Sequence, residues 1–309
     1  MHTEIDVLIR AMPAFVILII VESIFLIKEH HFKKSMKHFT TNIAIAIGFA
    51  IINILFKGVI WLIYEFIYVH RIYSFHINIL IIVVICFIAD DFSYYWFHRL
   101  SHQIRFLWAS HVVHHTSEEY SLLTAGLRHT WTGNFSGTFL FWAWMPFVGF
   151  NPVMVLVIKS VSIIYQFWIH TETISKMPAW FEAVFNTPSH HRVHHGSDVI
   201  YLDKNYAGTL IIWDKIFKTY QPEEFTPQYG LTKKLTTSNP FVIAFHEWIN
   251  MFKDLKKSKS FSECIHHVFN APGWSKNGET KTTKQLRAET GRIKNQLKLR
   301  RYIMLSEHY

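Results

Sequence analysis

The chain has few of the residues that build disulfide-stabilised or zinc-finger proteins. It contains only two cysteines among 309 residues, Cys86 within an apolar run and Cys264 in a more polar region. Two isolated cysteines provide neither a disulfide framework nor a CxxC pair for zinc. We therefore expect any bound metal to be held by other side chains, and the 21 histidines are the natural candidates.

Charged residues are also scarce, at 17% of the chain, whereas hydrophobic residues make up 50% and include 27 Phe and 11 Trp. This apolar and aromatic content exceeds that of ordinary soluble proteins and indicates an integral membrane protein. The net charge of +9 comes largely from one early loop and from the C-terminal tail, and no recognisable nucleic-acid-binding motif accompanies it. We expect no nucleic-acid partner.

Three apolar runs, at residues 7–27, 41–69 and 77–97, are long enough to cross a bilayer. The residues before the first run, MHTEID, lack the basic flank and small-residue cleavage site of a secretory signal. We therefore interpret the first run as a retained membrane anchor. A multi-pass membrane protein is predicted.

The loop between the first two runs predicts the orientation in the membrane. It is rich in lysine and includes Lys28, Lys33, Lys34 and Lys37. An excess of basic residues in a short loop marks it as cytoplasmic. The N terminus is then outside, and the third run ends at the cytoplasmic face, where we expect the active site.

Two shorter apolar runs, 135–150 and 153–169, are separated by Asn151 and Pro152. Each is short for a full crossing, so they predict either a tight transmembrane hairpin or a re-entrant pair buried against protein. Beyond them the chain is more polar, and no Gly/Ser-rich linker divides it. The predicted fold class is all-α: a polytopic membrane helical bundle with a cytoplasmic helical cap that carries a histidine-rich dimetal site.

We predict one integral-membrane domain at residues 1–275 and a basic C-terminal tail at 276–309. The tail contains many Lys and Arg residues with Ile293, Leu297 and Leu299 interspersed. A solvated end is the simpler interpretation. The alternative is a helix attracted to anionic lipid head groups.

Three histidine clusters lie beside the apolar runs: HRLSH at 98–102, HVVHH at 111–115 and HRVHH at 191–195. In HRLSH the two histidines are four residues apart and share one helix face, where they are placed to hold one ion or to flank two. In the other two motifs, one helical turn would supply three imidazoles to a compact centre. Eight imidazoles exceed the four ligands of a tetrahedral zinc and suit two ions.

Ligand type alone does not choose the metal, because imidazole is acceptable to iron, zinc, copper and nickel. A structural zinc site would favour cysteine or closed four-ligand sets, and neither pattern is present. Two metals at a membrane face, walled by aromatic and aliphatic residues, fit the oxidation of an apolar chain by activated dioxygen.

Acidic and aromatic residues precede the first cluster on the same predicted helix face. Tyr95 lies three and Asp91 seven residues before His98. A carboxylate at this position is placed to accept the second ring N–H of a ligating histidine and so to fix its tautomer. The alternative is that Asp90 and Asp91 only line a wet cavity. Two adjacent acids at the end of a bilayer-length run favour a role in the site.

In their order and their position beside the membrane runs, the clusters resemble those of the fatty acid hydroxylase and sterol desaturase superfamily of membrane non-haem di-iron enzymes. DFSYYWFHRLSH resembles the first motif of that superfamily and WASHVVHH the second. Four further segments are most similar to the alkylglycerol monooxygenase subgroup and its bacterial relatives: HHTSEEYSLLTAGLRHT, NTPSHHRVHHGSD, YLDKNYAGTLIIWDKIFKTY and APGW. The resemblance covers roughly residues 77–273.

The resemblance implies nine metal ligands: His98, His102, His111, His114, His115, His170, His191, His194 and His195. It also implies supporting roles next to the site for Asp91, Tyr95, His190 and Asn205. His129 departs from the subgroup, which has glutamine in LRQS where this chain has LRHT. The histidines outside the motifs are expected to have no catalytic role: His30, His31, His38, His246, His266 and His267.

The cofactors implied by the resemblance are two iron ions and an external electron donor, either tetrahydrobiopterin or a redox protein. No HPGG-type segment of a fused cytochrome b5 is present, so electrons are expected from outside. Glu118, Glu119 and Tyr120 are candidates for a pterin site through motif similarity alone. The expected partners are dioxygen, this reductant and a membrane lipid.

The implied reaction is hydroxylation of an unactivated C–H bond of the lipid, at the ether-adjacent carbon if the substrate is an alkylglycerol. One alternative is a hydroxylase or desaturase of the same superfamily that acts on a sterol, carotenoid or fatty acyl lipid. Another is a histidine-rich metal transporter, although its ligands should line a path near mid-bilayer, whereas these gather at the ends of the runs. A non-catalytic metal-binding membrane protein is the third.

Overall fold

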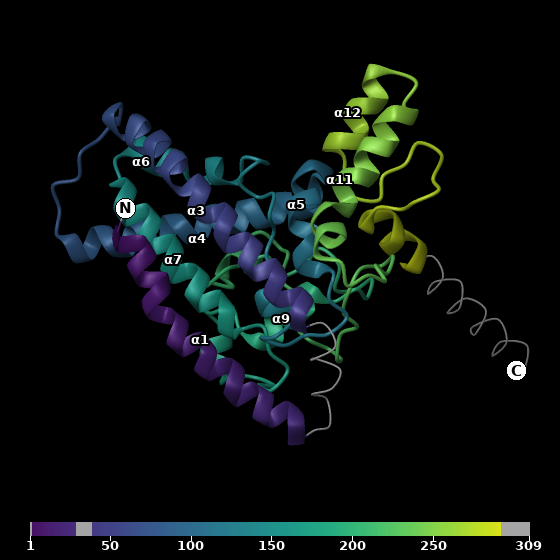
Figure 1. Ribbon diagram of the computed structural model, residues 1–309, viewed down its shortest axis with the longest axis horizontal. Helices are drawn as coiled ribbons and strands as arrows, with labels where there is room; N and C mark the ends of the chain where they lie inside the picture. Colours follow the sequence, from purple (N-terminus) through teal and green to yellow (C-terminus); the bar gives the residue numbers. More distant parts are fainter. Residues whose placement is uncertain (1, 29–38, 292–309) are drawn as a thin grey trace, which may run out of the picture.

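The computed structural model describes residues 2–28 and 39–291, and these residues fold almost entirely into helices (Figure 1). Within this part of the chain the extended pairing amounts to two isolated bridges, Phe185–Leu210 and Gly196–Tyr229. The predicted all-α class is confirmed. Several residues used in the sequence analysis lie outside the described residues: Lys33, Lys34 and Lys37, three early histidines (His30, His31, His38), and Ile293, Leu297 and Leu299 of the tail.

Three of the described helices are long and apolar enough to cross a membrane: α1 (His2–Lys28), α3 (Phe39–Val69) and α4 (Ile79–Gln103). They match the three predicted spans. Apolar side chains point outward along them, as Leu55 and Phe66 of α3 do. Such surfaces fit a hydrocarbon environment rather than water. By the length and composition of these helices, the chain is a multi-pass membrane protein.

Helix α4 changes character along its length. Its first half is largely exposed, whereas its second half is mostly buried and carries Asp90, Asp91, Tyr95, His98 and His102. The helix ends at Ile104, whose extended backbone turns the chain into α5 (Arg105–His115). The polar half of α4 is therefore enclosed by protein, as a charged segment of a membrane helix requires.

The two shorter apolar runs do not form a symmetrical hairpin. The first run is broken into the 3-10 turn η2 (Thr138–Trp142) and the short helix α6 (Trp144–Val148), whereas the second forms the continuous helix α7 (Pro152–Trp168). Gly149, with φ +129°, lies against the backbone of Tyr73 and leaves no room for a Cβ atom there. The choice between a transmembrane hairpin and a re-entrant pair stays a prediction, because both runs combine buried side chains such as Met145 and Val155 with exposed ones such as Leu140 and Val161.

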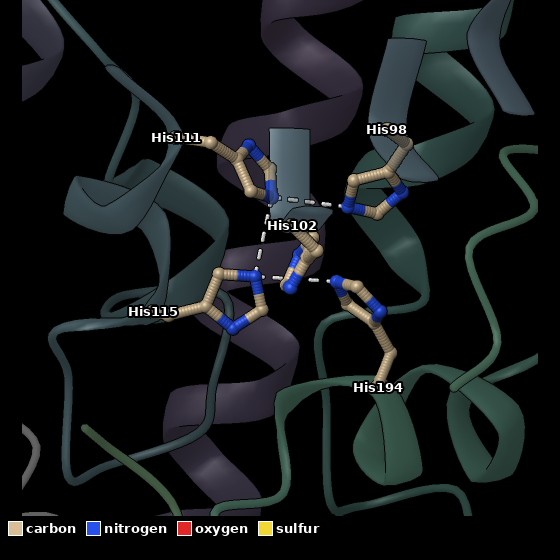
Figure 2. A group of neighbouring side chains, drawn as sticks. All are labelled: His98, His102, His111, His115 and His194. Carbon is tan, nitrogen blue, oxygen red and sulfur yellow. Dashed lines mark hydrogen bonds between the residues drawn. The ribbon is translucent and has the colours of Figure 1, made fainter. Parts of the chain in front are cut away.

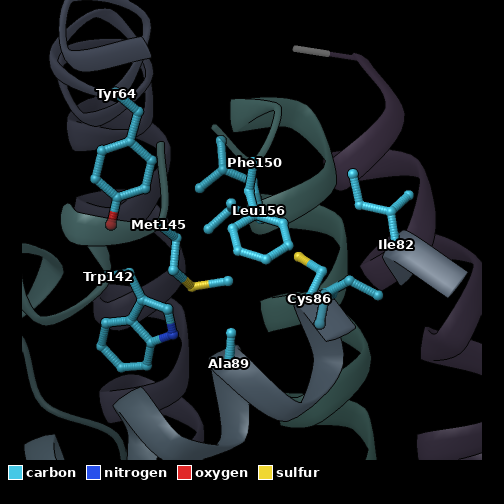
Figure 3. Packing of buried hydrophobic residues seen from close by; sticks show 10 residues of the cluster. Tyr64, Ile82, Cys86, Ala89, Trp142, Met145, Phe150 and Leu156 are labelled. Atoms are coloured by element: carbon cyan, nitrogen blue, oxygen red, sulfur yellow. The ribbon is translucent and has the colours of Figure 1, made fainter. Parts of the chain in front are cut away.

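A hydrophobic core joins these elements. It contains Tyr64 of α3, Cys86 and Ala89 of α4, and Trp142 and Met145 from the broken run (Figure 3). Helix α7 packs against both α1 and α4. This core fixes the directions of α4 and α7, the two helices that lead to the histidine-rich end of the bundle.

A cap of shorter elements covers that end. It comprises the 3-10 turn η1 (Ala125–Leu127) and the helices α8 (Ala179–Glu182), α9 (Pro188–His195), α10 (Ile212–Ile216), α11 (Pro240–Lys257) and α12 (Phe261–Phe269). Helix α9 is buried at every position, and α11 and α12 project from the bundle (Figure 1). Arg287 donates to the carbonyls of Val199 and Leu202, so the described part of the tail contacts the cap. The domain boundary at residue 275 stays a prediction.

Candidate metal centre

The structure brings all nine histidines predicted as ligands into two adjoining groups. The first group contains His98, His102, His111, His115 and His194. The second contains His114, His170, His191 and His195. Within each group, one ring nitrogen of every residue lies within 4.8 Å of the others. That these rings bind metal remains a prediction, but their convergence from α4, α5, α9 and the end of α7 is a property of the fold.

Two of the sequence motifs are divided between the groups. In α5, His111 and His115 point to the first group and His114 to the second; in α9, His194 joins the first group and His191 and His195 the second. The expectation that one turn serves a single compact centre was wrong. At 3.6 residues per turn, positions four apart differ by only about 40° in direction, whereas the third position is rotated away from both. Each short helix therefore supplies both groups.

The rings of the first group point toward a common centre (Figure 2). Nε2 of His111 lies 3.0 Å from Nε2 of His98 and 3.2 Å from Nε2 of His115. Nε2 of His194 lies 3.2 Å from Nε2 of His115. His102 enters the same centre, and its buried Nε2 has no hydrogen-bond partner. Both histidines of HRLSH serve this group, so the motif contributes to one group and does not flank two.

The second group has similar spacing. Nε2 of His170 lies 3.1 Å from Nε2 of His114 and 2.9 Å from Nε2 of His191. Nε2 of His195 lies 3.0 Å from Nε2 of His114. The His115 and His195 rings stack with centroids 4.4 Å apart. This stacking places the two groups side by side.

Backbone carbonyls hold the outer nitrogen of four rings. Nδ1 of His98 donates to Tyr206 over 2.7 Å, and Nδ1 of His194 donates to Lys204 over 3.0 Å. Nδ1 of His114 donates to Arg128 over 3.0 Å, and Nδ1 of His170 donates to Gln166 over 2.7 Å. A carbonyl oxygen only accepts, so the proton must lie on Nδ1. In a neutral ring, Nε2 then presents a bare lone pair to the centre.

Burial keeps these rings neutral. It lowers the pKa of His170 to about 3, and it lowers the pKa of His114 well below its usual value, with neighbouring imidazoles adding to the effect. The same causes lower the pKa of His194. Neutral imidazole is the form that coordinates a metal.

This arrangement fits metal ions on physical grounds. Between His114 and His170, two bare Nε2 lone pairs face each other, so the contact contains no hydrogen that either ring can donate. Metal–nitrogen bonds of about 2.0–2.1 Å bring neighbouring ligand atoms to roughly 3 Å from one another, which matches the 2.9–3.2 Å spacings within the groups. A cation shared by the rings removes the repulsion. The donor set is purely imidazole.

Asp91 does not contact a histidine ring as expected from the sequence. Its carboxylate accepts from the backbone N–H groups of Thr209 and Leu210 over 2.8 and 2.9 Å and from Nε1 of Trp213 over 3.0 Å. The histidine N–H groups are taken by backbone carbonyls instead. Asp91 therefore fastens the loop of residues 205–211 to α4, and this loop carries the carbonyl that holds His98.

Tyr95 acts on the same loop through a chain of hydrogen bonds. Its hydroxyl contacts Thr219 over 2.9 Å, and Thr219 donates to Asp214 over 2.6 Å. The Asp214 carboxylate accepts from the backbone N–H groups of Tyr206 and Ala207. The carbonyl of Tyr206 accepts from His98. Tyr95 and Asp214 therefore act on a predicted ligand indirectly, through the backbone of Tyr206. Nothing in the sequence pattern had pointed to Asp214.

Asn205 contacts helix α9 through the backbone of His190, which is a residue of that helix. Nδ2 of Asn205 donates to the carbonyls of His190 and Gln221, and its backbone adopts φ +53°. The His190 ring is buried outside both groups, and neither of its nitrogens has a hydrogen-bond partner. Burial lowers the pKa of His190 to about 4. Asn205 thus fastens the backbone of α9, and His190 belongs to neither group.

Two buried arginines, which the sequence did not single out, also organise the site. Arg192 of α9 pairs with Glu223 through Nε and Nη2, at 2.7 and 2.6 Å. It also donates to the carbonyl of Thr171, next to His170. Arg128 donates to Asn42 and Thr116, and its carbonyl holds His114. A planar guanidinium has five N–H donors, so one arginine can bind several acceptors at once.

The other residues named from the sequence lie at varied positions. Tyr120 approaches the second group, with its ring 5.1 Å from His195, whereas Glu118 is exposed and paired with Lys234. His129 stacks on Phe49 at 4.7 Å. The later histidines, which the sequence assigned no catalytic role, lie outside both groups: His246, His266 and His267.

Two cavities reach the histidines and share no lining residue. The polar cavity, about 540 Å³, is lined by His102, His115, His194 and His195 and by cap segments that include residues 230–235. The inner cavity, about 240 Å³, is lined by His111, His114 and His170 and by side chains of α1, α3, α4 and α7. One cavity thus opens among the cap elements and the other among the long apolar helices.

Together these features define an integral membrane helical protein with a buried, histidine-only candidate for a dinuclear metal site. Residues 83–219 match the profile of the fatty acid hydroxylase family. The matched segment runs from α4 to the loop after α10 and contains all nine histidines.

Alkylglycerol monooxygenases are among its curated relatives. The chain is 41% identical to the enzyme of Xenopus tropicalis over 188 residues, which cover 61% of this chain and 41% of that protein. It is 41% identical to the Homo sapiens enzyme over 189 residues, with the same coverage. The ornithine lipid hydroxylase OlsE of Rhizobium tropici is 26% identical over 161 residues, 50% of this chain and 46% of that protein. No solved structure matches the chain. The chain spans about two fifths of the length of the alkylglycerol monooxygenases.

Proposed function

We propose that this chain is a membrane-bound non-haem di-iron oxygenase that hydroxylates an unactivated C–H bond of a lipid. The observation that carries the proposal is the pair of groups of buried imidazoles on the wall of a cavity between membrane-length helices. The nine histidines are the proposed ligands of the two ions. The bound metal pair would supply dioxygen activation and oxidation of the C–H bond.

The protein's own residues contribute position and environment. The carbonyls of Tyr206, Arg128, Gln166 and Lys204 fix the tautomers of four rings, so that the inner nitrogens point at the ions. Burial keeps water from the centre and keeps the rings neutral. The inner cavity lets a lipid approach the second group from among the apolar helices, so that one carbon is held next to the centre.

We propose an alkylglycerol as substrate and the ether-adjacent carbon as the site of hydroxylation. The names of the relatives support a lipid, and two of them name alkylglycerols. Insertion of one oxygen atom into that C–H bond gives a hemiacetal, which breaks into an aldehyde and a glycerol lipid. The second oxygen atom leaves as water, which requires two electrons and two protons from a reductant outside the chain.

The polar cavity is the proposed route for that reductant, either tetrahydrobiopterin or a redox protein. It reaches His102 and His194 of the first group from among polar cap residues. The cytoplasmic location of the centre is also a proposal. It depends on the basic loop before α3, most of which lies outside the described residues.

The test is metal analysis combined with a product assay on purified protein. We expect two irons per chain and conversion of 1-O-hexadecylglycerol to hexadecanal that requires dioxygen and a reductant. His114→Ala should retain membrane insertion and lose the product. Zinc alone, or no dioxygen-dependent product from alkylglycerol, sterol, carotenoid or fatty acyl lipids, would contradict an oxygenase and favour a transporter or a structural metal protein. Product from one of the other lipids would reassign the substrate within the superfamily.

A further inference from the structure

We propose that the end of the inner cavity remote from the histidines binds an uncharged, hydroxyl-bearing lipid head group, and that Asp90 is the residue that recognises it. This inference rests on the proposed lipid substrate and specifies how the lipid is oriented. Asp90, Trp142 and Lys159 all line this cavity, and because the first and last of them contact Trp142 we call the three residues its polar end.

The polar end and the histidine end are joined by two helices. Asp90 lies eight residues before His98 on α4, which is roughly 12 Å along a helix. Lys159 lies eleven residues before His170 at the end of α7, which is roughly 16 Å. Both residues line the same cavity as His114 and His170. A ligand in this cavity therefore has a polar region at one end and the proposed metal centre at the other.

One carboxylate oxygen of Asp90 is available to accept a hydrogen bond from a ligand. Its side chain is fully buried, and Oδ1 accepts from Nε1 of Trp142 over 2.7 Å. The second oxygen, Oδ2, has no hydrogen-bond partner. Buried polar atoms are nearly always paired, and an ionisable residue within a membrane helix generally marks a functional site. A hydroxyl group of a ligand in the cavity would provide the missing donor.

The charges at this end favour an uncharged ligand. Nζ of Lys159 lies 3.8 Å from the centroid of the Trp142 ring, whose N–H is bound to Asp90. One acid thus lies at the edge of this indole ring and one base over its face. A free fatty acid carboxylate entering there would be attracted by Lys159 but repelled by Asp90, whereas a glycerol-like group offers hydroxyl donors for the acid and oxygen acceptors for the base.

The remaining walls and the size are consistent with a head group followed by the first carbons of a chain. Aromatic side chains also line the cavity, among them Phe49, Phe97 and Phe167. The volume of about 240 Å³ is smaller than that of typical small-molecule pockets, roughly 300–1,000 Å³. The cavity therefore does not enclose a whole long-chain lipid, and the rest of the chain would lie among the membrane helices.

The inference is tested by ligand binding to the full-length protein in nanodiscs, without turnover. The probes are tritiated 1-O-hexadecylglycerol and hexadecyl methyl ether, which has the ether but no hydroxyl. The variant is Asp90→Asn, which keeps an acceptor for Trp142 and replaces Oδ2 by an amide. The matched control is Ser93→Ala on the same helix, because Ser93 is buried, accepts from Trp144 and does not line the inner cavity.

We expect Asp90→Asn to weaken hexadecylglycerol binding about tenfold, in line with the loss of one hydrogen bond to a charged group, and to leave binding of the methyl ether unchanged. Ser93→Ala should change neither. Unaltered hexadecylglycerol binding by Asp90→Asn, or an equal loss for both probes, would overturn the inference. If wild-type protein binds hexadecylglycerol through Asp90 but never oxidises it, the proposed function fails and the head-group site stands.

Discussion

Nε2 of His114 and Nε2 of His170 face each other at 3.1 Å, although the proton of each neutral ring lies on Nδ1 and points to a backbone carbonyl. Two buried lone pairs at this distance repel each other unless a cation lies between them. The backbone thus creates a site whose unfavourable electrostatics are relieved by metal. His114 and His170 are 56 residues apart in the sequence, so the tertiary structure brings their two Nε2 atoms together.

Removal of His170 should empty one half of the centre. In His170→Ala, the second group keeps three of its four imidazoles, and the first group keeps all five. We expect metal content to fall from about two ions per chain to about one and lipid oxidation to be lost, as measured by elemental analysis of purified protein. His266→Gln is the control, because this ring lies outside both groups and lines neither cavity. Full metal content in His170→Ala would show that His170 is not a ligand.

Arg192 should be required for the position of α9. Its guanidinium is bound to Glu223 and to the carbonyls of Thr171, Ile174 and Ser175. Removal of one partner of a buried ion pair costs about 3–5 kcal/mol, so Arg192→Ala should lower the unfolding temperature strongly. Arg192→Lys keeps the charge but loses the fork of donors, and we expect partial loss of metal from the second group. Wild-type stability in both variants would contradict this role.

Asp91→Ala should act through the loop of residues 205–211 and not through a histidine proton. One buried and two partly buried donors lose their acceptor, and an unpaired buried donor costs about 1–3 kcal/mol. We expect a lower unfolding temperature and a loss of metal that follows the loss of stability. Tyr95→Phe is the milder comparison, since it removes one hydroxyl from the same network. Metal loss at unchanged stability would restore the direct role first predicted for Asp91.

Acid should destabilise the metal-free protein from about pH 6.5 downward. Burial lowers the pKa of the seven grouped histidines outside the membrane spans: His111, His114, His115, His170, His191, His194 and His195. Unfolded histidine titrates near pH 6.5, whereas folded His170 titrates at about 3. Between these values the unfolded chain binds more protons, so the free energy of unfolding falls as pH falls. Thermal unfolding of chelator-treated protein between pH 7.5 and 5 measures this, and a constant midpoint would contradict it.

His129→Gln should change substrate preference without changing metal content. The ring lies parallel to that of His114, with centroids 6.2 Å apart, and lines the inner cavity. Burial lowers its pKa to about 4, so it is a neutral wall residue at pH 7. We expect two ions in the variant and an altered ratio of rates for alkylglycerols of different chain lengths. Loss of metal would instead make His129 part of the centre.

The spans and eight of the nine histidines were accessible from the sequence because both are local patterns: long apolar runs, and imidazoles at helical spacing. His170 lies in no such motif, and only the family resemblance pointed to it. The division of HVVHH and HRVHH between two groups follows from the helical repeat. Which histidines meet in each group was not accessible, because it depends on how α5 and α9 face each other. The role of Asp91 was also missed. A carboxylate seven residues before His98 has the right spacing for a histidine partner, but the chain brings the backbone of Thr209 and Leu210 to it instead. Contacts made by backbone groups of a loop do not depend on side-chain type, so no residue pattern in the sequence indicates them.

The separate linings of the polar and inner cavities have a kinetic consequence. If a water-soluble reductant uses one and a bilayer lipid the other, the two reactants come from different phases and do not compete for one entrance. Saturation by the lipid would then follow its mole fraction in the surrounding membrane, whereas saturation by the reductant would follow its aqueous concentration. Diluting the lipid with inert phospholipid at constant bulk concentration should therefore slow turnover.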